Sequence, residues 1–404
     1  MNRSETDRVL IAGAGPAGCV AALILARAGV PVTLFEAETE LPTDLRASTF
    51  HPPTLDMLAE LGLADLLVAE GLIAPAYQFR DRRSGDAATF DLTCLEGLTS
   101  YPFRLQCEQF RLTRFAVAAL EAEPLAEIRF GLGVVAAEET DAGVTLTLDG
   151  PAGRATAEGG WLIGADGASS AVRRSAGISF EGFTYPEQWV VASTPVDFAK
   201  TIPNLAPVTY VSDPDEWFVL LRTKELWRVL IPVADDADAE EILSDAFIEA
   251  KLQGISARPD PYEIRHRTIY RVHQRVAETY RKGRIALVGD AAHINNPLGG
   301  MGMNGGVQDA VNLAKKLVAI LKNGADADVM LDHYAAQRRA IAEEYVLAHT
   351  HQNKQAIEQK DPAARRAHLE RLQDIAATPE KLLAYVRKGS MIDAVEKSMA
   401  IAPG

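Results

Sequence analysis

The sequence predicts an α/β protein in which a Rossmann-like βαβ unit opens the chain, a mostly antiparallel β-sheet is inserted later, and helices form the C-terminus. Three observations favour this class. A glycine fingerprint stands between two apolar runs within residues 9–36, apolar and aromatic residues alternate between 184 and 234, and residues 325–404 are charged with a helical pattern. At about 150 residues per domain, 404 residues are enough for two or three domains.

The composition narrows the range of partners. The chain is 48% hydrophobic and 24% charged, as in ordinary globular proteins, and its formal net charge is -14. An acidic molecule has no electrostatic basis for binding a phosphate backbone, so we expect no nucleic-acid partner. Cys19, Cys94 and Cys107 have no metal-ligand spacing and would leave one thiol unpaired, which favours a reducing, cytoplasmic location.

The apolar run at residues 9–26 could be mistaken for a signal peptide or a short membrane helix. Pro16 and three glycines interrupt it, and Glu5 and Asp7 stand where a signal peptide carries positive charge. No other stretch is long and apolar enough to span a bilayer. We therefore expect no membrane span.

The same run predicts a nucleotide-binding βαβ unit. RVLIA forms a strand, Gly13, Gly15 and Gly18 fill the GxGxxG pattern, a helix continues to Gly29, and PVTLFE forms a second strand that closes on Glu36. The first glycine permits the tight turn, the second lets the backbone approach a pyrophosphate, and the third lets helix and strand pack closely. The free N–H groups of the helix start then face the phosphates, and Glu36 can accept the ribose hydroxyls. The expected cofactor contacts are Gly13, Gly15, Ala17, Gly18 and Glu36.

A second strand–turn–helix lies at residues 161–173, WLIGADGASSAVR. The apolar strand ends at Gly164, Asp166 and Gly167 form the turn, and Ser169 or Ser170 is a candidate N-cap. Taken alone, a simple turn is the better interpretation of this segment.

A third such segment lies at residues 289–306, GDAAHINNPLGGMGMNGG, where six of eighteen positions are glycine. RIALV before it has the composition of a buried strand, and the residues after it have helical periodicity. The segment is therefore a glycine-rich turn that joins a strand to a helix.

In this order, the segments resemble those of the single-component FAD-dependent aromatic hydroxylases, over most of the chain. GAGPAGCVAALILARAG with Glu36 is similar to their FAD fingerprint, and LRASTFHPPTLDMLAELGL is similar to a segment whose arginine, here Arg46, reaches the cofactor. FRLQCEQFRLTRFAVAAL resembles a segment in which Gln106 would contact the flavin chain. GADGASSAVR and GDAAH resemble the Asp-Gly and Gly-Asp motifs, which makes Asp166 a residue for FAD and NAD(P)H and Asp290 a ligand of a flavin sugar hydroxyl.

The resemblance implies that FAD lies extended across the domain with its ring against PLGGMGMNGG, where bare backbone can approach closely. The N–H groups of Gly302, Met303 and Asn304 would face flavin N1 and the C2 carbonyl, where a helix start favours negative charge by about 0.3–1 kcal/mol. Pro297 and Gly300 would lie beside the flavin and the oxygen site.

The chemistry implied is that of the family. NAD(P)H reduces FAD, O2 adds to give a C4a-hydroperoxyflavin, and one oxygen atom is transferred to an activated aromatic ring, a phenol or a hydroxylated N-heteroaromatic compound. The absence of a side-chain triad or metal cluster from the sequence is consistent with this, because the cofactor carries the difficult step.

The substrate residues are less well indicated. The inserted sheet would cover the flavin and offers Tyr210, Trp217, Phe218, Arg222 and Trp227 as pocket candidates, although packing is the better interpretation for each. Arg222 would have a catalytic-site role only if the substrate carries a carboxylate. His51 and His293 are candidate bases, but a structural role is favoured for a histidine beside a turn.

We expect a FAD-binding domain from residues 1–75, 103–183 and 275–350, a substrate-binding sheet domain from 76–102 and 184–274, and a helical segment from 351–404. The C-terminal helices would serve packing or homodimer formation. Two alternatives to hydroxylation are a double-bond reductase on the same scaffold and a flavin-holding protein that binds a ligand without turnover. A halogenase would need a WxWxIP signature, which is not found because Trp217 and Trp227 are ten residues apart.

Overall fold

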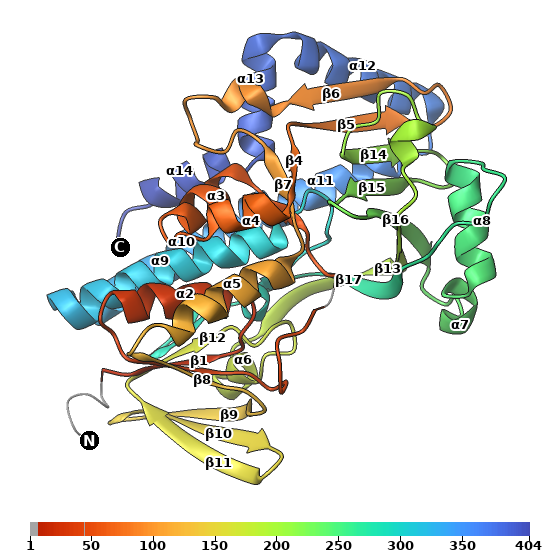
Figure 1. The fold of residues 1–404 in the computed structure, drawn as a ribbon. Coiled ribbons are helices and arrows are strands. Elements are labelled where there is room, and N and C mark those ends of the chain that lie inside the picture. The colour runs from red at the N-terminus through yellow and green to blue at the C-terminus, as the bar shows by residue number, and fades with distance from the viewer. Residues whose placement is uncertain (1–6, 44) are drawn as a thin grey trace.

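The structure is a computed structural model that describes residues 7–43 and 45–404 (Figure 1). A six-stranded sheet forms its base, in the order β18-β19-β12-β1-β2-β8, and all neighbours are parallel except β18 and β19. The strands are β1 (Val9–Ala12), β2 (Val32–Phe35), β8 (Ala126–Arg129), β12 (Trp161–Gly164), β18 (Arg281–Lys282) and β19 (Ile285–Leu287). This sheet confirms the predicted βαβ start of the chain.

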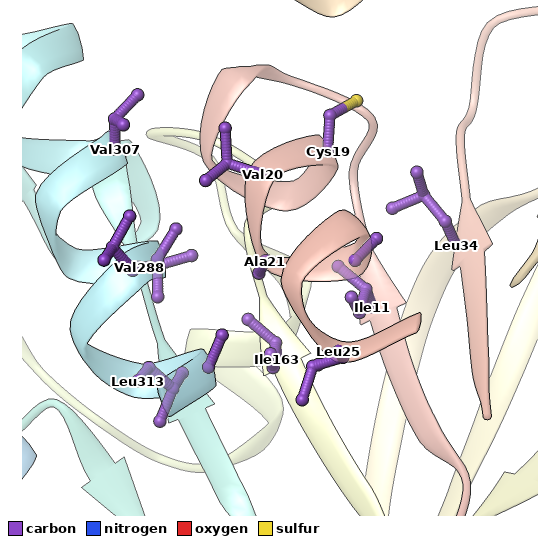
Figure 2. Close-up of a cluster of buried hydrophobic side chains, with 14 of the residues drawn as sticks. Ile11, Cys19, Val20, Ala21, Leu25, Leu34, Ile163, Val288, Val307 and Leu313 are labelled. Carbon is purple, nitrogen blue, oxygen red and sulfur yellow. The ribbon is translucent and has the colours of Figure 1, made fainter. Parts of the chain in front are cut away.

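Helix α2 (Pro16–Arg27) packs between this sheet and the long helix α9 (Gly302–Asn323). Figure 2 shows how α2 contributes to the core: Val20 and Leu25 of α2 meet Ile11 of β1, Ile163 of β12 and residues of α9 in one buried cluster. Helices α3 (Pro52–Ala59), α4 (Ala64–Glu70) and α5 (Gln109–Glu121) extend this layer. Burial of this apolar surface holds the two helices and the sheet in fixed positions.

Two small sheets flank the base. One has the order β11-β10-β9 and consists of β9 (Gly133–Thr140), β10 (Gly143–Gly150) and β11 (Gly153–Gly159), with α6 (Ala171–Ser175) against β9. The other has the order β3-β7-β4 and consists of β3 (Thr49–Phe50), β4 (Leu72–Ala74) and β7 (Arg104–Gln106). The second of these lies at the functional site.

An eight-stranded sheet stands above the base, in the order β20-β17-β13-β16-β15-β14-β5-β6 (Figure 1). It is antiparallel except for the parallel pair β5 and β14. The strands are β5 (Ala76–Asp81), β6 (Ala87–Asp91), β13 (Phe180–Thr194), β14 (Val208–Ser212), β15 (Phe218–Arg222), β16 (Trp227–Ala234), β17 (His266–Ala277) and β20 (His293–Ile294). The predicted mostly antiparallel sheet is therefore present, and residues 76–91 join it as expected.

Alternation gives this sheet two different faces. The outer face, with Phe218, Leu220 and Trp227, packs against α8 (Asp245–Ile255), which follows the short α7 (Ala239–Ile242). The inner face, with Trp189 and Tyr210, packs against the C-terminal helices and the glycine-rich turn. The inner face is therefore the one that can take part in a site.

The C-terminus is helical, as the sequence predicts. It consists of α10 (Ala327–Ile341), a π-helical turn (Ala342–Leu347), α11 (Ala348–Ile357), α12 (Pro362–Ala377), α13 (Pro379–Gly389) and α14 (Ile392–Ala400). Figure 1 shows α12 and α13 over β5 and β6, and α14 beside α10 and α3. No helix of the described residues combines the length and the apolarity that a bilayer crossing requires.

Candidate functional site

The first glycine fingerprint forms a tight cradle at the start of α2. Gly13 has φ +97°, and a Cβ atom there would lie 2.4 Å from the carbonyl oxygen of Ala165. A Cβ at Gly18 would lie 2.0 Å from the carbonyl oxygen of Gly13. At Gly15, in contrast, a Cβ would have no described atom within 4 Å, and no described side chain caps α2. The open space and the free N–H groups, including that of Ala17, fit an approaching pyrophosphate.

Glu36 lies where the sequence predicts, one residue beyond β2. Its Oε2 accepts a hydrogen bond from the backbone N–H of Ala14 at 2.8 Å, and its Oε1 accepts one from Glu38 at 3.1 Å. Each carboxylate oxygen keeps a further lone pair. The glycine loop therefore holds the carboxylate in place for a pair of ribose hydroxyls.

The Asp-Gly segment supports the first fingerprint. Asp166 accepts hydrogen bonds from Ser170 Oγ at 2.5 Å and from the backbone N–H of Val172 at 3.0 Å, so both its oxygens serve the start of α6. Ser170, one of the two predicted N-caps, accepts from the N–H of Arg173 at 2.9 Å. A contact of Asp166 with FAD or NAD(P)H stays a prediction.

Arg173 joins this segment to the Gly-Asp motif. Its buried guanidinium donates to the carbonyl oxygens of Ala168 and Ala291, both at 2.8 Å, and lies 3.8 Å from the centroid of the Phe180 ring. Segments that are more than a hundred residues apart are thereby held side by side.

Asp290 combines two properties that are seldom found together. Desolvation by the surrounding protein raises the pKa of its carboxyl group, against the opposing effects of His293 and Arg46, yet the residue is solvent-accessible. A carboxyl group that is desolvated by protein and still accessible can accept a hydrogen bond from a ligand hydroxyl. Arg46 is also exposed and its charge acts on the Asp290 carboxyl group, so the two predicted cofactor residues lie near each other.

A buried ion cluster anchors the helix that follows. Asp309 accepts from His293 Nε2 at 2.8 Å, from Arg338 Nε at 2.6 Å and from the backbone N–H of Gly289 at 3.1 Å. Burial alone would raise the pKa of Asp309, but Arg338 and His293 hold it below its usual value. The His293 side chain is thus hydrogen-bonded to the buried Asp309 carboxylate.

The glycines of the turn at 297–306 have two different roles. Gly300 has φ +67°, and its N–H donates to the carbonyl oxygen of the exposed Pro297 at 3.0 Å, so this position needs a left-handed backbone. A Cβ at Gly305 would lie 3.0 Å from the His293 ring, and one at Gly306 would lie 3.0 Å from the Cα of Gly289. Close approach of a flavin was expected to explain the glycines in general, but the last two are required by packing within the protein.

Asn304 ties the turn to the segment before α3. Its side-chain Nδ2 donates to the carbonyl oxygens of Thr49 and Gly300 at 2.8 and 2.7 Å, and its Oδ1 accepts from the N–H of His51 at 2.9 Å. The Asn304 side chain is therefore occupied. The backbone N–H groups of Gly302, Met303 and Asn304 lie in the first turn of α9, which no described side chain caps, and are available to a ligand.

Three further candidate residues come from β7 and from the start of α3. Gln106 is fully buried, its Oε1 accepts from Thr49 Oγ1 at 3.1 Å, and its Nε2 has no partner among the described residues. His51 Nε2 lies 2.8 Å from the carbonyl oxygen of Gly299. Arg104 stands two residues before Gln106 on the same strand, so both side chains point to one face. Gln106 and His51 were among the residues expected at the site, whereas Arg104 was not, although the alternation in RLQ places it on the same face as Gln106.

The inserted sheet divides the predicted pocket residues between its faces. Tyr210 and Trp217 belong to the inner cluster, together with Leu298 of the glycine-rich turn, whereas Phe218 and Trp227 pack on the outer side.

Arg222 also lies on the outer side. Its guanidinium pairs with Asp197 at 3.3 Å and lies 5.4 Å from the centroid of the Trp227 ring. Contact of Arg222 with a substrate carboxylate is a prediction that this placement does not favour, because strand alternation turns the side chain away from the glycine-rich turn.

The residues present fit a bound FAD. The uncapped start of α2 with Gly15 suits the pyrophosphate, Glu36 and Asp290 suit sugar hydroxyls, and the free amide of Gln106 offers a donor to the flavin chain. When bound, FAD would supply the electron transfer and oxygen activation that side chains cannot.

Comparisons with known proteins agree with this geometry. The FAD binding domain family matches residues 6–348. Para-nitrophenol 4-monooxygenase of Pseudomonas sp. (strain WBC-3) is 34% identical over 368 residues, 89% of each chain. The 6-hydroxy-3-succinoylpyridine 3-monooxygenase HspB of Pseudomonas putida (strain DSM 28022 / S16) is 37% identical over 339 residues, which cover 83% of this chain and 85% of HspB.

The fold comparison gives the same result. The crystal structure of p-nitrophenol 4-monooxygenase PnpA from Pseudomonas putida DLL-E4 matches with a TM-score of 0.89 and 32% identity, over 95% of this chain and 98% of PnpA. The resemblance seen in the sequence is thereby confirmed, and the chain belongs to the FAD binding domain family as a flavin-dependent aromatic hydroxylase.

Proposed function

We propose that the protein uses NAD(P)H and O2 to hydroxylate a small acidic aromatic compound, either a phenol or a hydroxypyridine. One observation carries the proposal: Leu298 of the glycine-rich turn packs in the same buried cluster as the aromatic inner face of the eight-stranded sheet. A flavin ring lying on that turn would face the cluster that contains Trp189, Tyr77 and Tyr210, whose aromatic side chains suit contact with a flat apolar ring. The nitrophenol and the hydroxypyridine named for two relatives are flat aromatic compounds of this kind.

In this proposal the chain contributes position and electrostatics. The apolar inner face excludes water from the reacting atoms and holds the aromatic ring in one orientation. The uncapped start of α9, at Gly302 and Met303, favours negative charge on the part of the cofactor that it faces. Pro297 and Gly300 bound the side of the turn that the ring and O2 would share.

The experiment is to mix the FAD-loaded protein with NADH or NADPH and 4-nitrophenol while following nicotinamide absorbance and dissolved oxygen. We expect 4-nitrophenol to increase the rates of NAD(P)H oxidation and of oxygen consumption. We also expect mass spectrometry to detect a ring-hydroxylated product. Anaerobic consumption of NAD(P)H with reduction of the added compound would instead support a double-bond reductase. Binding of the compound with no consumption would support a ligand-binding protein.

Three further predictions accompany this function. We propose the division into a FAD-binding part (1–75, 103–183, 275–350), a substrate part (76–102, 184–274) and a helical part (351–404). Strand β13 runs across the boundary at residue 183 and joins the first two parts. Free thiols at Cys19, Cys94 and Cys107 favour a cytoplasmic location. A homodimer stays a prediction, and size-exclusion chromatography with light scattering would test it.

A further inference from the structure

Arg104 is a buried cation without a carboxylate partner. Arg104 is only 3% exposed, and its guanidinium lies 3.9 Å from the centroid of the Tyr77 ring. Nη2 donates to the carbonyl oxygen of Gly389 at 3.3 Å, but Nε and Nη1 have no hydrogen-bond partner among the described residues. No carboxylate of the described chain forms an ion pair with Arg104. A buried charge with free N–H groups is costly unless an anion compensates it.

The histidines around Arg104 cannot supply that compensation. Burial and the charge of Arg104 lower the pKa of His51 to about 3, and burial, Lys388 and Arg104 lower the pKa of His349 to about 4. Both rings are therefore neutral at ordinary pH. The Nδ1 atoms of both rings are also buried without a partner among the described residues.

Arg104 lies where the glycine-rich turn, which is predicted to hold the flavin, meets the aromatic inner face of the eight-stranded sheet. Thr49 pairs with Gln106 and Phe50 with Leu105, so His51 and Arg104 come next along the two strands. His51 contacts the turn at Gly299, while Arg104 contacts Tyr77 of the sheet. On the far side, Tyr77, Phe90 and Tyr385 form a stack with centroid distances of 5.1 and 4.6 Å.

We infer that Arg104 binds the ionised oxygen of an aromatic substrate, so that the protein takes its phenol or hydroxypyridine as the oxyanion; this rests on the proposed function. Nε and Nη1 of Arg104 keep N–H groups without a partner, and either can donate a charge-assisted hydrogen bond to a charged oxygen. His51 donates through Nε2 to Gly299 and keeps a lone pair at Nδ1, so it offers no donor to an anion. A phenolate carries its charge on an oxygen bonded directly to the ring, so that oxygen can meet Arg104 while the ring lies against the stacked aromatic residues.

The inference predicts how binding depends on pH. The titratable and charged groups around Arg104 are His51 of the α3 start, His349 of α11, Tyr77 of β5, Tyr210 of β14, and Tyr385 and Lys388 of α13. Burial raises the pKa of Tyr385 to about 12 and that of Tyr77 well above its usual value, so these two tyrosines stay neutral as the histidines do. Between about pH 5 and pH 9, affinity should follow the ionisation of the ligand and increase as the phenol loses its proton.

The test is equilibrium binding to the FAD-loaded protein without NAD(P)H. 4-Nitrophenol is the probe, 4-nitroanisole is its uncharged counterpart and 4-nitrobenzoate is the carboxylate counterpart. Arg104→Met removes the charge at similar volume, Arg104→Lys keeps it, and Arg114→Met is the matched control, since Arg114 is an exposed residue of α5 that pairs with Glu70. Flavin absorbance reports cofactor content for each protein.

We expect Arg104→Met to weaken 4-nitrophenol binding by about 10- to 100-fold while Arg104→Lys recovers part of the loss. Affinity for 4-nitroanisole, flavin content and the Arg114→Met control should stay unchanged.

Unchanged 4-nitrophenol affinity in folded, flavin-loaded Arg104→Met would overturn the inference, as would an equal loss for 4-nitroanisole, which would indicate packing. Preference of the wild type for 4-nitrobenzoate over 4-nitrophenol, or no binding of 4-nitrophenol, would also overturn it. If Arg104→Met does not fold, the inference would be overturned by an Arg104→Lys variant that binds 4-nitrophenol with full affinity and no pH dependence. The proposed function fails separately, when no phenol stimulates NAD(P)H and oxygen consumption by the wild type.

Discussion

At the scale of single residues, the three fingerprint glycines do not have the same reason to be glycine. Gly13 and Gly18 are required by the fold, because a Cβ at either would meet backbone at 2.4 and 2.0 Å. Gly15 has an ordinary backbone conformation, with φ -69° and ψ 177°, and open space beside it. Only a ligand would make a side chain at Gly15 harmful.

This difference predicts opposite results for two similar variants. Gly15→Ala should leave the thermal stability of the apoprotein unchanged and lower FAD affinity, because the new methyl group occupies space that the pyrophosphate needs. Gly18→Ala should lower the free energy of unfolding by about 1–3 kcal/mol through overpacking. Thermal denaturation and flavin titration of both apoproteins would check this. Normal FAD affinity in Gly15→Ala would contradict the N-terminal assignment.

At the scale of elements, helix α9 is the part whose position decides the site. Its first turn borders the predicted flavin, and Gly306 packs on Gly289. Further along the helix, Asp309 connects His293, Arg338 and the Gly289 N–H. Asp309 is completely buried, so these contacts replace the water that would otherwise solvate its charge.

Asp309→Asn should therefore lower the free energy of unfolding by about 3–5 kcal/mol, because it leaves buried Arg338 without its counter-charge. Urea denaturation followed by circular dichroism would measure the change. Asp328→Asn is a suitable control, since Asp328 pairs with Arg281 at 3.0 Å but its side chain is 82% exposed, and a surface pair contributes about 0–1 kcal/mol. Equal effects of the two substitutions would contradict the role given to the cluster.

At the scale of the whole molecule, the C-terminal helices complete the site that the N-terminal segments begin. Arg104 binds Gly389 at the end of α13, His349 of α11 lies near Arg104, and Met301 packs with Met391 at the start of α14. The burial that joins these distant segments also keeps His51 and His349 neutral.

This predicts a stability that depends on pH. Below about pH 6.5 the unfolded chain protonates both histidines while the folded protein does not, until about pH 3 for His51 and about pH 4 for His349. The unfolded state then binds more protons, so stability falls as pH decreases, by about 1.4 kcal/mol per pH unit for each histidine. The double variant His51→Gln, His349→Gln should have a flatter dependence of unfolding free energy between about pH 6.5 and 4. An identical slope in wild type and variant would contradict this.

The sequence by itself determined the elements that follow local patterns. The βαβ start, the strand–turn–helix at Asp166, the helix from Gly302 and the alternating sheet are all present, because glycine spacing and apolar periodicity act over a few residues. Family resemblance extended this to FAD and aromatic hydroxylation, which the comparisons confirm.

Only the tertiary structure decided which side chains meet. It turned Arg222 to the outer face with Asp197, gave Gly305 and Gly306 a packing role, and brought Arg104 beside His51 and His349 from three separate segments. Contacts of this kind depend on strand register and on how helices far apart in the chain pack together. No local pattern encodes them, because a residue such as Arg104 becomes a buried, uncompensated charge only after Tyr77 and Gly389 close around it.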